Sequence, residues 1–161
     1  MKYVKSKIEG QEIHRLGAHI RSLPSGLESL LSYWLQKCAG RPMPARDDLP
    51  VQELRPWLGH LALIELAGDG KFRVRLCGTN LIRRFGREAT GVLVDDLAVD
   101  VAQQLKAILR SVDRAAAPVI AVSHVQLGRT AVSHSEVALP LSGAGGRIGT
   151  VMLGSYPIRE T

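Results

Sequence analysis

Residues 72–91 read FRVRLCGTNLIRRFGREATG, and this stretch decides how the chain folds. Its first part alternates apolar residues with arginines, which is typical of a strand that buries one face. The apolar members of that alternation are Phe72, Val74 and Leu76. The run before it, 60–66, is also apolar, and an Ala-Gly-Asp-Gly turn separates the two runs. Together the two runs predict an antiparallel hairpin.

A corner follows this strand. Thr79 is placed to cap a short helix over 80–85, and Gly86 is placed to end it. The same Cys-Gly-Thr-Asn sequence could instead present Cys77 as a nucleophile, as strand-to-helix turns do in some hydrolases. None of the five histidines stands in a local pattern with Cys77, and alternation puts Cys77 on the arginine side of the strand. A structural corner is the favoured interpretation, and a small thiol enzyme that uses Cys77 stays open as an alternative.

Strand-like runs stand at both ends of the domain, around a helical middle. Beyond the hairpin they cover 118–127, 131–141 and 147–156. Apolar residues at spacings of three and four predict a long helix that starts at Asp95 and Asp96 and ends before Pro118. Strands and helices do not alternate along the chain. The order therefore favours an α+β fold, with a five-stranded antiparallel sheet and helices on one face.

An amphipathic helix is predicted ahead of the sheet. Ser25 and Glu28 form a capping box at its start, and Gly40 follows it as a stop. Its apolar stripe must pack either on the body of the domain or on the same stripe of a second subunit, and the sequence leaves both open. The candidate interface residues on this stripe are Leu27, Leu30, Leu31, Trp34 and Leu35.

The length and composition indicate one domain. The chain has 161 residues, of which 45% are hydrophobic, and this is the size of a single domain with its own core. We expect that domain to span 25–157, after a leader over 1–24 that is either helical or flexible. The leader lacks the pattern of a secretory signal, and no segment reaches the roughly 18 apolar residues of a membrane span. The two cysteines form no CxxC pair, which fits a reducing, cytoplasmic setting.

The positive charge raises nucleic acid as a partner. A formal net charge of +6 would attract a phosphate backbone without sequence readout. However, the basic residues are scattered, apart from one cluster at Arg83, Arg84 and Arg87. Aromatic residues, at 4%, are too few for a series of stacking platforms. Nucleic-acid binding through this cluster is therefore an alternative and not the favoured function.

Polar residues interrupt the strands that follow the long helix. Alternation assigns Ser123, Ser133 and Ser135 to the core-facing side, where their hydroxyls either bond to neighbouring backbone or line a cavity for a polar ligand. The same alternation assigns His124 and His134 to the wetter side, flanking a hairpin turn. Two exposed histidines without a third ligand do not make a metal site, so none is expected.

Catalytic motifs are absent from the sequence. No P-loop, HExxH or GxSxG motif occurs, and the glycines over 143–149 lack the spacing of a dinucleotide-binding loop. We therefore expect no enzymatic activity.

Five short sequence motifs in the chain resemble those of a known family. They are Tyr33-Trp34, Pro44-Ala45-Arg46, Leu76-Cys77-Gly78-Thr79, Phe85-Gly86 with Gly91, and Leu139-Pro140-Leu141. In this order, and over roughly 30–153, they resemble the short proteobacterial PAS-like proteins of the PAS domain superfamily. The resemblance covers most of the chain, and each motif is short.

The resemblance implies a PAS fold, with sheet order 2-1-5-4-3 and a cavity between the sheet and the helices. The cavity candidates are Phe72, Val74, Leu76, Thr79, Ser123, Ser133 and Ser135. It also implies a cytoplasmic sensory or regulatory module of signal transduction, which acts as a homodimer or on a signalling protein. The chain lacks the Asn-Cys-Arg phrase of the flavin-type light sensors and has no histidine between Gly78 and Pro118. Haem and flavin are therefore disfavoured, and the expected ligand is an unknown small molecule or none.

Overall fold

The computed structural model describes residues 6–8, 11–15 and 23–158. Within these residues seven strands form one antiparallel sheet: β1 (Ser6–Ile8), β2 (Gln11–Arg15), β3 (Leu61–Leu66), β4 (Phe72–Cys77), β5 (Val119–Leu127), β6 (Thr130–Ser142) and β7 (Ile148–Pro157). The α-helices are α1 (Ser25–Cys38), α2 (Ile82–Phe85) and α3 (Val99–Ala115). A 3-10 helix over Val51–His60 leads into β3, and shorter 3-10 turns join the other elements.

The sheet is larger than the sequence predicts. Its order is β1-β2-β5-β6-β7-β3-β4, so the five expected strands are neighbours in the order β4-β3-β7-β6-β5. The prediction of a five-stranded sheet is wrong, because β1 and β2 add to the edge of β5. Where the leader is described it forms strands and not a helix: Gln11 and Ile13 are buried and Glu12 between them is half-buried, which is a period of two.

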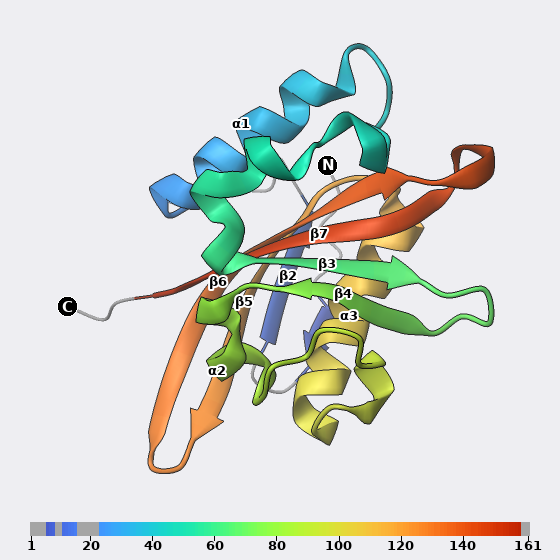
Figure 1. The fold of residues 1–161 in the computed structure, drawn as a ribbon. Coiled ribbons are helices and arrows are strands. Elements are labelled where there is room, and N and C mark those ends of the chain that lie inside the picture. The colour runs from blue at the N-terminus through green and yellow to red at the C-terminus, as the bar shows by residue number, and fades with distance from the viewer. Residues whose placement is uncertain (1–5, 9–10, 16–22, 159–161) are drawn as a thin grey trace.

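Helices cover both faces of the sheet, whereas the sequence predicts helices on one face (Figure 1). One face, here called the α3 face, packs against α2 and α3, with Ile64, Val74 and Leu153 among its buried strand residues. The other face, here called the α1 face, packs against α1 and the 3-10 helix Val51–His60. Two separate apolar clusters result, one on each side of the sheet.

The start of α1 differs from the predicted capping box. Ser25 is already the first residue of the helix, and Pro24 is the N-cap. The Pro24 carbonyl accepts hydrogen bonds from the backbone N–H groups of Leu27 and Glu28, at 2.9 and 3.1 Å. No side chain caps the helix, because the capping position falls on proline, which has no hydroxyl.

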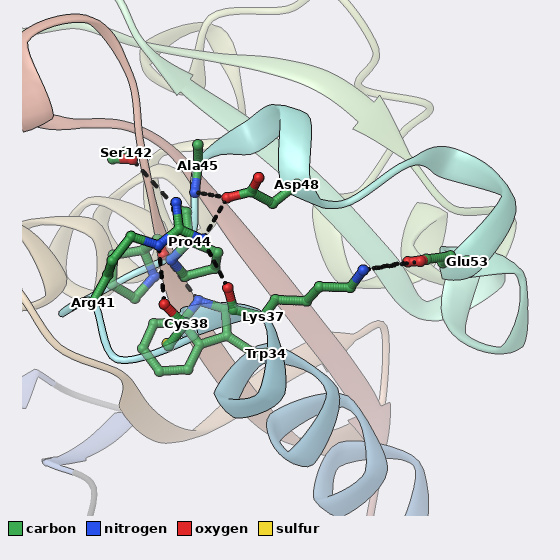
Figure 2. A network of polar contacts seen from close by, with 10 residues as sticks. Trp34, Lys37, Cys38, Arg41, Pro44, Ala45, Asp48, Glu53 and Ser142 are labelled. Carbon is green, nitrogen blue, oxygen red and sulfur yellow. Dashed lines mark hydrogen bonds and ion pairs between the residues drawn. The ribbon is translucent and has the colours of Figure 1, made fainter.

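A polar network fastens the end of α1 to the sheet (Figure 2). The Trp34 indole Nε1–H donates to the Pro140 carbonyl at 2.9 Å, and the Ser142 backbone N–H donates to the Pro44 carbonyl, also at 2.9 Å. Arg41 donates to the last carbonyls of α1 and pairs with Asp48 at 2.8 Å. The helix therefore belongs to the domain itself.

This attachment corrects most of the predicted interface. Leu27, Leu30 and Trp34 are 0%, 0% and 2% exposed and lie in the cluster on the α1 face, so they are not available to a second subunit. Leu31 is half-buried against the same cluster. Leu35 alone among the predicted interface residues is exposed, at 51%.

A β-bulge in β4 changes which residues share a face. Leu63 of β3 pairs with Leu76, and Ile64 pairs with Val74, so Arg75 is the extra residue. Phe72 and Val74 consequently lie on the α3 face, and Leu76 lies on the α1 face. Cys77 falls on the α3 face with Phe72 and Val74, although uninterrupted alternation predicts the opposite.

The corner after β4 requires glycine. A Cβ at Gly78 would lie 2.2 Å from the Leu58 carbonyl oxygen, far inside van der Waals contact. The Thr79 hydroxyl caps no helix, since a 3-10 turn over Thr79–Leu81 starts directly after Gly78. Gly86 ends α2 with φ of 81°, as predicted from the sequence. The Cys-Gly-Thr-Asn sequence is thus a structural corner.

Candidate functional site

The strand register brings Ser123 and His134 together on the α3 face. Ser123 of β5 pairs directly with His134 of β6, and the two are 0% and 3% exposed. His124 is exposed on the α1 face, where its Nδ1 lies 2.6 Å from the Ser133 hydroxyl. Ser135 lies on that face too. The prediction that both histidines are solvated is therefore wrong for His134.

The register explains this error. In β5 the odd-numbered residues lie on the α3 face, whereas in β6 the even-numbered residues do. Two rows of paired residues cross the sheet on that face. They are Gln11, Ser123, His134 and Pro157, and beside them Ile13, Ala121, Glu136 and Ser155. Periodicity along one strand gives the alternation but does not give the face.

A buried ion pair stands at the centre of these rows. Arg84 of α2 and Glu136 of β6 are 0% and 1% exposed, and the guanidinium donates two hydrogen bonds to the carboxylate at 2.9 and 3.0 Å. Burial alone would raise the pKa of Glu136, but the charge and hydrogen bonds of Arg84, with the Ser123 hydroxyl, bring it below its usual value. Glu136 is therefore an anion paired inside the fold.

Further polar groups surround this pair and form a buried polar cluster, made of Gln11, Arg84, Ser123, His134, Glu136 and Ser155. The Gln11 amide donates to the Ser123 hydroxyl at 3.0 Å and to the Gln104 carbonyl at 3.1 Å. Four buried atoms of the cluster have no hydrogen-bond partner among the described residues: Gln11 Oε1, Arg84 Nη1, His134 Nδ1 and Ser155 Oγ. Each such atom costs about 1–3 kcal/mol, so the concentration of four in one place is unusual for a purely structural core.

A pocket of about 350 Å³ opens beside the cluster, between the corner after β4, helix α2, and the place where the start of β6 pairs with the end of β7. This polar pocket is lined by His60, Thr79, Asn80, Arg83, Val132, His134 and Pro157. His134 thus belongs to both the cluster and the pocket. Burial, with the nearby Arg84 and His60, lowers the pKa of His134 against the opposing charge of Glu136, so the imidazole is neutral at pH 7.

His60 forms a rigid wall of the pocket. Its Nδ1 lies 3.2 Å from the Ser155 carbonyl oxygen and its Nε2 lies 3.2 Å from the Asn80 side-chain nitrogen. An amide nitrogen can only donate and a carbonyl can only accept, so Nδ1 carries the proton. The ring also stacks on Tyr156, with centroids 4.0 Å apart. Both nitrogens of His60 are therefore occupied, unlike Nδ1 of His134.

The predicted cavity residues are divided among different places. Thr79 lines the polar pocket, and with Leu76 it also borders a shallower hollow of about 260 Å³ near Gly59. Phe72 and Val74 pack in the apolar cluster of the α3 face, with Val74 fully buried. Ser123 belongs to the buried polar cluster, whereas Ser133 and Ser135 lie on the opposite face. The structure does not bring these seven residues into one cavity.

The residues missed by the sequence analysis are Arg83, Arg84, His134 and Glu136 as members of one site. A usable signal was present, because the continuous apolar run over 137–141 indicates a strand that is buried on both faces, and Glu136 stands directly before it. A buried carboxylate requires a partner cation, and arginine is the usual choice.

The two alternative sites lose support from this geometry. Burial raises the pKa of the Cys77 thiol, and the hydrogen bonds recorded for it are with the backbone of Gly78, at 3.8 Å, and of Ala89, neither of which is a base that could activate a thiol. Arg84 is buried in the ion pair, which leaves Arg83 and Arg87 as the exposed members of the basic cluster.

Within the part of the chain that the structure describes, no three metal-ligating side chains gather at one point. Within the same residues, no helix is both long and apolar enough to cross a membrane.

Comparisons with known proteins add the following. A solved structure of an RNA-binding Light-Oxygen-Voltage receptor is similar at 14% sequence identity and a TM-score of 0.45, over 71% of this chain and 35% of that chain. This chain therefore spans about a third of the length of that receptor. The comparison with curated proteins gives no match. A family model described as "PAS domain" matches residues 23–156, which run from before α1 into β7, and the chain therefore belongs to the PAS domain family.

Proposed function

We propose that this protein is a non-enzymatic PAS regulatory module that binds a small organic molecule and acts through contact with another protein. The molecule occupies the polar pocket, and the partner is a second copy of the chain or a signalling protein. Ligand binding would alter the position of α2, which carries one pocket residue, Arg83, and one cluster residue, Arg84.

The observation that carries this proposal is the group of four unpartnered buried atoms beside the pocket. A core selected only for stability would pair such atoms or replace them with apolar ones. Their position next to an open pocket supports a site in which the fold gives up stability for recognition. The pocket volume of about 350 Å³ is near the lower end of small-molecule sites, which favours a small organic ligand over haem or flavin.

We place the protein contact on the outer face of α1. The inner side of the helix is used within the domain, and Leu35 remains 51% exposed on the outer side. An exposed leucine on a helix that is firmly held by the sheet offers a rigid apolar contact for a partner.

Sedimentation velocity of the wild-type protein and of Leu35→Glu tests this contact. We expect a wild-type dimer and a monomeric variant with an unchanged circular dichroism spectrum. Val99→Glu is the matched control, because Val99 is 75% exposed on α3 and should leave the dimer intact. A wild-type protein that is monomeric at every concentration, or a Leu35→Glu dimer, would contradict a contact on α1.

A further inference from the structure

We infer that the polar pocket binds a small monocarboxylate, with the carboxylate held between Arg83 and His134 and the apolar part against Val132 and Pro157. This inference rests on the proposed function, because it names the chemical class of the ligand at the same site.

The charge of the pocket favours an anion. Arg83 lines the pocket and forms no ion pair or hydrogen bond with any described residue, and none of the described lining residues is acidic. Both ring nitrogens of His60 already have partners, so Arg83 is the charged group that the wall offers to a ligand. A guanidinium presents two parallel N–H groups that match the two oxygens of a carboxylate. One cation in the wall suits a ligand with one negative charge.

His134 supplies the second contact. His134 is 3% exposed, and its Nδ1 has no partner among the described residues although the residue lines the pocket. A neutral imidazole donates from one nitrogen, and an oxygen of the ligand would accept that hydrogen bond. The oxygens of one carboxylate can satisfy both His134 and Arg83, which a purely apolar or cationic ligand cannot do.

The apolar part of the pocket wall indicates what the ligand carries beside its carboxylate. Val132 and Pro157 are apolar, so the pocket combines a polar end with an apolar side. Inorganic phosphate would leave that apolar side without contacts, and a dianion would exceed the single charge of Arg83. A carboxylate attached to a few carbons or to one small ring fits both features.

The site is also coupled to the ion pair behind it. Arg83 and Arg84 are consecutive on α2, and His134 and Glu136 are two residues apart on the same face of β6. A carboxylate that draws Arg83 and His134 together therefore acts on the same two elements that the Arg84–Glu136 pair joins. This arrangement gives the ligand a direct mechanical effect on α2.

Titration of the ¹⁵N-labelled full chain, followed by its amide NMR signals, tests the inference. The probes are butyrate and benzoate, with butyramide as the uncharged counterpart of butyrate and inorganic phosphate as a different anion. We expect both carboxylates to shift the amide signals of Thr79, Arg83, Val132 and His134, and butyramide to shift none of them.

Arg83→Gln should weaken butyrate binding by about tenfold to a hundredfold, as expected when a charge-assisted hydrogen bond is lost. Arg87→Gln is the matched control, because it removes the same charge from the same segment without touching the pocket, and it should bind as the wild type does. His134→Asn, which keeps a donor near the Nδ1 position, should bind more tightly than His134→Leu.

Four outcomes would overturn the inference. Equal shifts with butyrate and butyramide would show that charge is not recognised. An unchanged affinity in Arg83→Gln, or shifts confined to other parts of the chain, would show that the carboxylate does not bind here. A response to phosphate but to neither carboxylate would reject the ligand class and leave small-molecule binding at the pocket standing. The sedimentation test of the α1 contact is independent of all four outcomes.

Discussion

Replacing Glu136 by glutamine tests the energetic role of the buried ion pair. The substitution preserves the shape of the side chain but removes its charge, and Arg84 then remains as a cation that is 0% exposed. Its Nη1 already lacks a partner, so the guanidinium would depend on a neutral amide oxygen for its remaining hydrogen bonds.

The expected loss follows from this burial. Removing one partner of a fully buried ion pair costs about 3–5 kcal/mol, because the other charge is left uncompensated. A domain of this kind has a total stability of about 5–15 kcal/mol, so Glu136→Gln should remove a large part of the free energy of unfolding. Replacing both charges, in Arg84→Met/Glu136→Leu, should give a protein that is more stable than Arg84→Met alone or Glu136→Leu alone.

Urea unfolding followed by circular dichroism measures these differences at pH 7. Glu65→Gln is the control, since Glu65 forms an ion pair with Arg75 at 2.7 Å but is 43% exposed, and we expect a far smaller effect there. The folded-state pKa of Glu136 lies below its usual value of 4.5, so its contribution should be present above about pH 4.5 and lost as the pH falls through the folded-state pKa. A Glu136→Gln variant that unfolds with the wild type, or a double variant that is no more stable than the singles, would refute the argument.

Further predictions concern the framework around the site. Gly78→Ala should destabilise the fold by at least the usual cost of overpacking, about 1–3 kcal/mol, in thermal unfolding, since the new Cβ would meet a backbone carbonyl at 2.2 Å. Gly68→Ala should be tolerated, because a Cβ there would meet nothing within 4 Å. Trp34→Phe should cost about 1–3 kcal/mol in urea unfolding, because the Pro140 carbonyl loses its donor at 2.9 Å, and an unchanged midpoint would show that this bond contributes nothing. Cys77 should react slowly with iodoacetamide at pH 7, and the rate should still be rising with pH beyond the ordinary thiol pKa of 9.0, because burial raises the pKa. Fast alkylation at pH 7 would contradict this.

The motifs that carry the family resemblance have structural explanations. Trp34 of the Tyr-Trp motif donates a hydrogen bond to Pro140 of the Leu-Pro-Leu motif, and the Pro-x-Arg motif contributes the Pro44 carbonyl to the same attachment (Figure 2). Gly78 is required by a close backbone contact, and Gly86 by a positive φ. These motifs could predict the fold because they contain the residues that join its elements.

The site was harder to predict from the sequence, for two physical reasons. Alternation along β6 does not reveal that His134 and Glu136 share a face with Ser123, because that depends on the pairing register between strands. The bulge at Arg75 is equally invisible and exchanges the faces of Leu76 and Cys77. Long-range pairing also attaches β2 to β5, and thereby brings Gln11 into the cluster.

Native mass spectrometry of the freshly purified protein, beside a denatured control, tests the central claim of a ligand-binding PAS module most directly. We predict an additional small mass on the native wild-type chain that is lost on denaturation, retained in Arg87→Gln and reduced in Arg83→Gln. A native chain with no additional mass, which also gains none when butyrate or benzoate is added, would contradict the claim that the polar pocket is a ligand site.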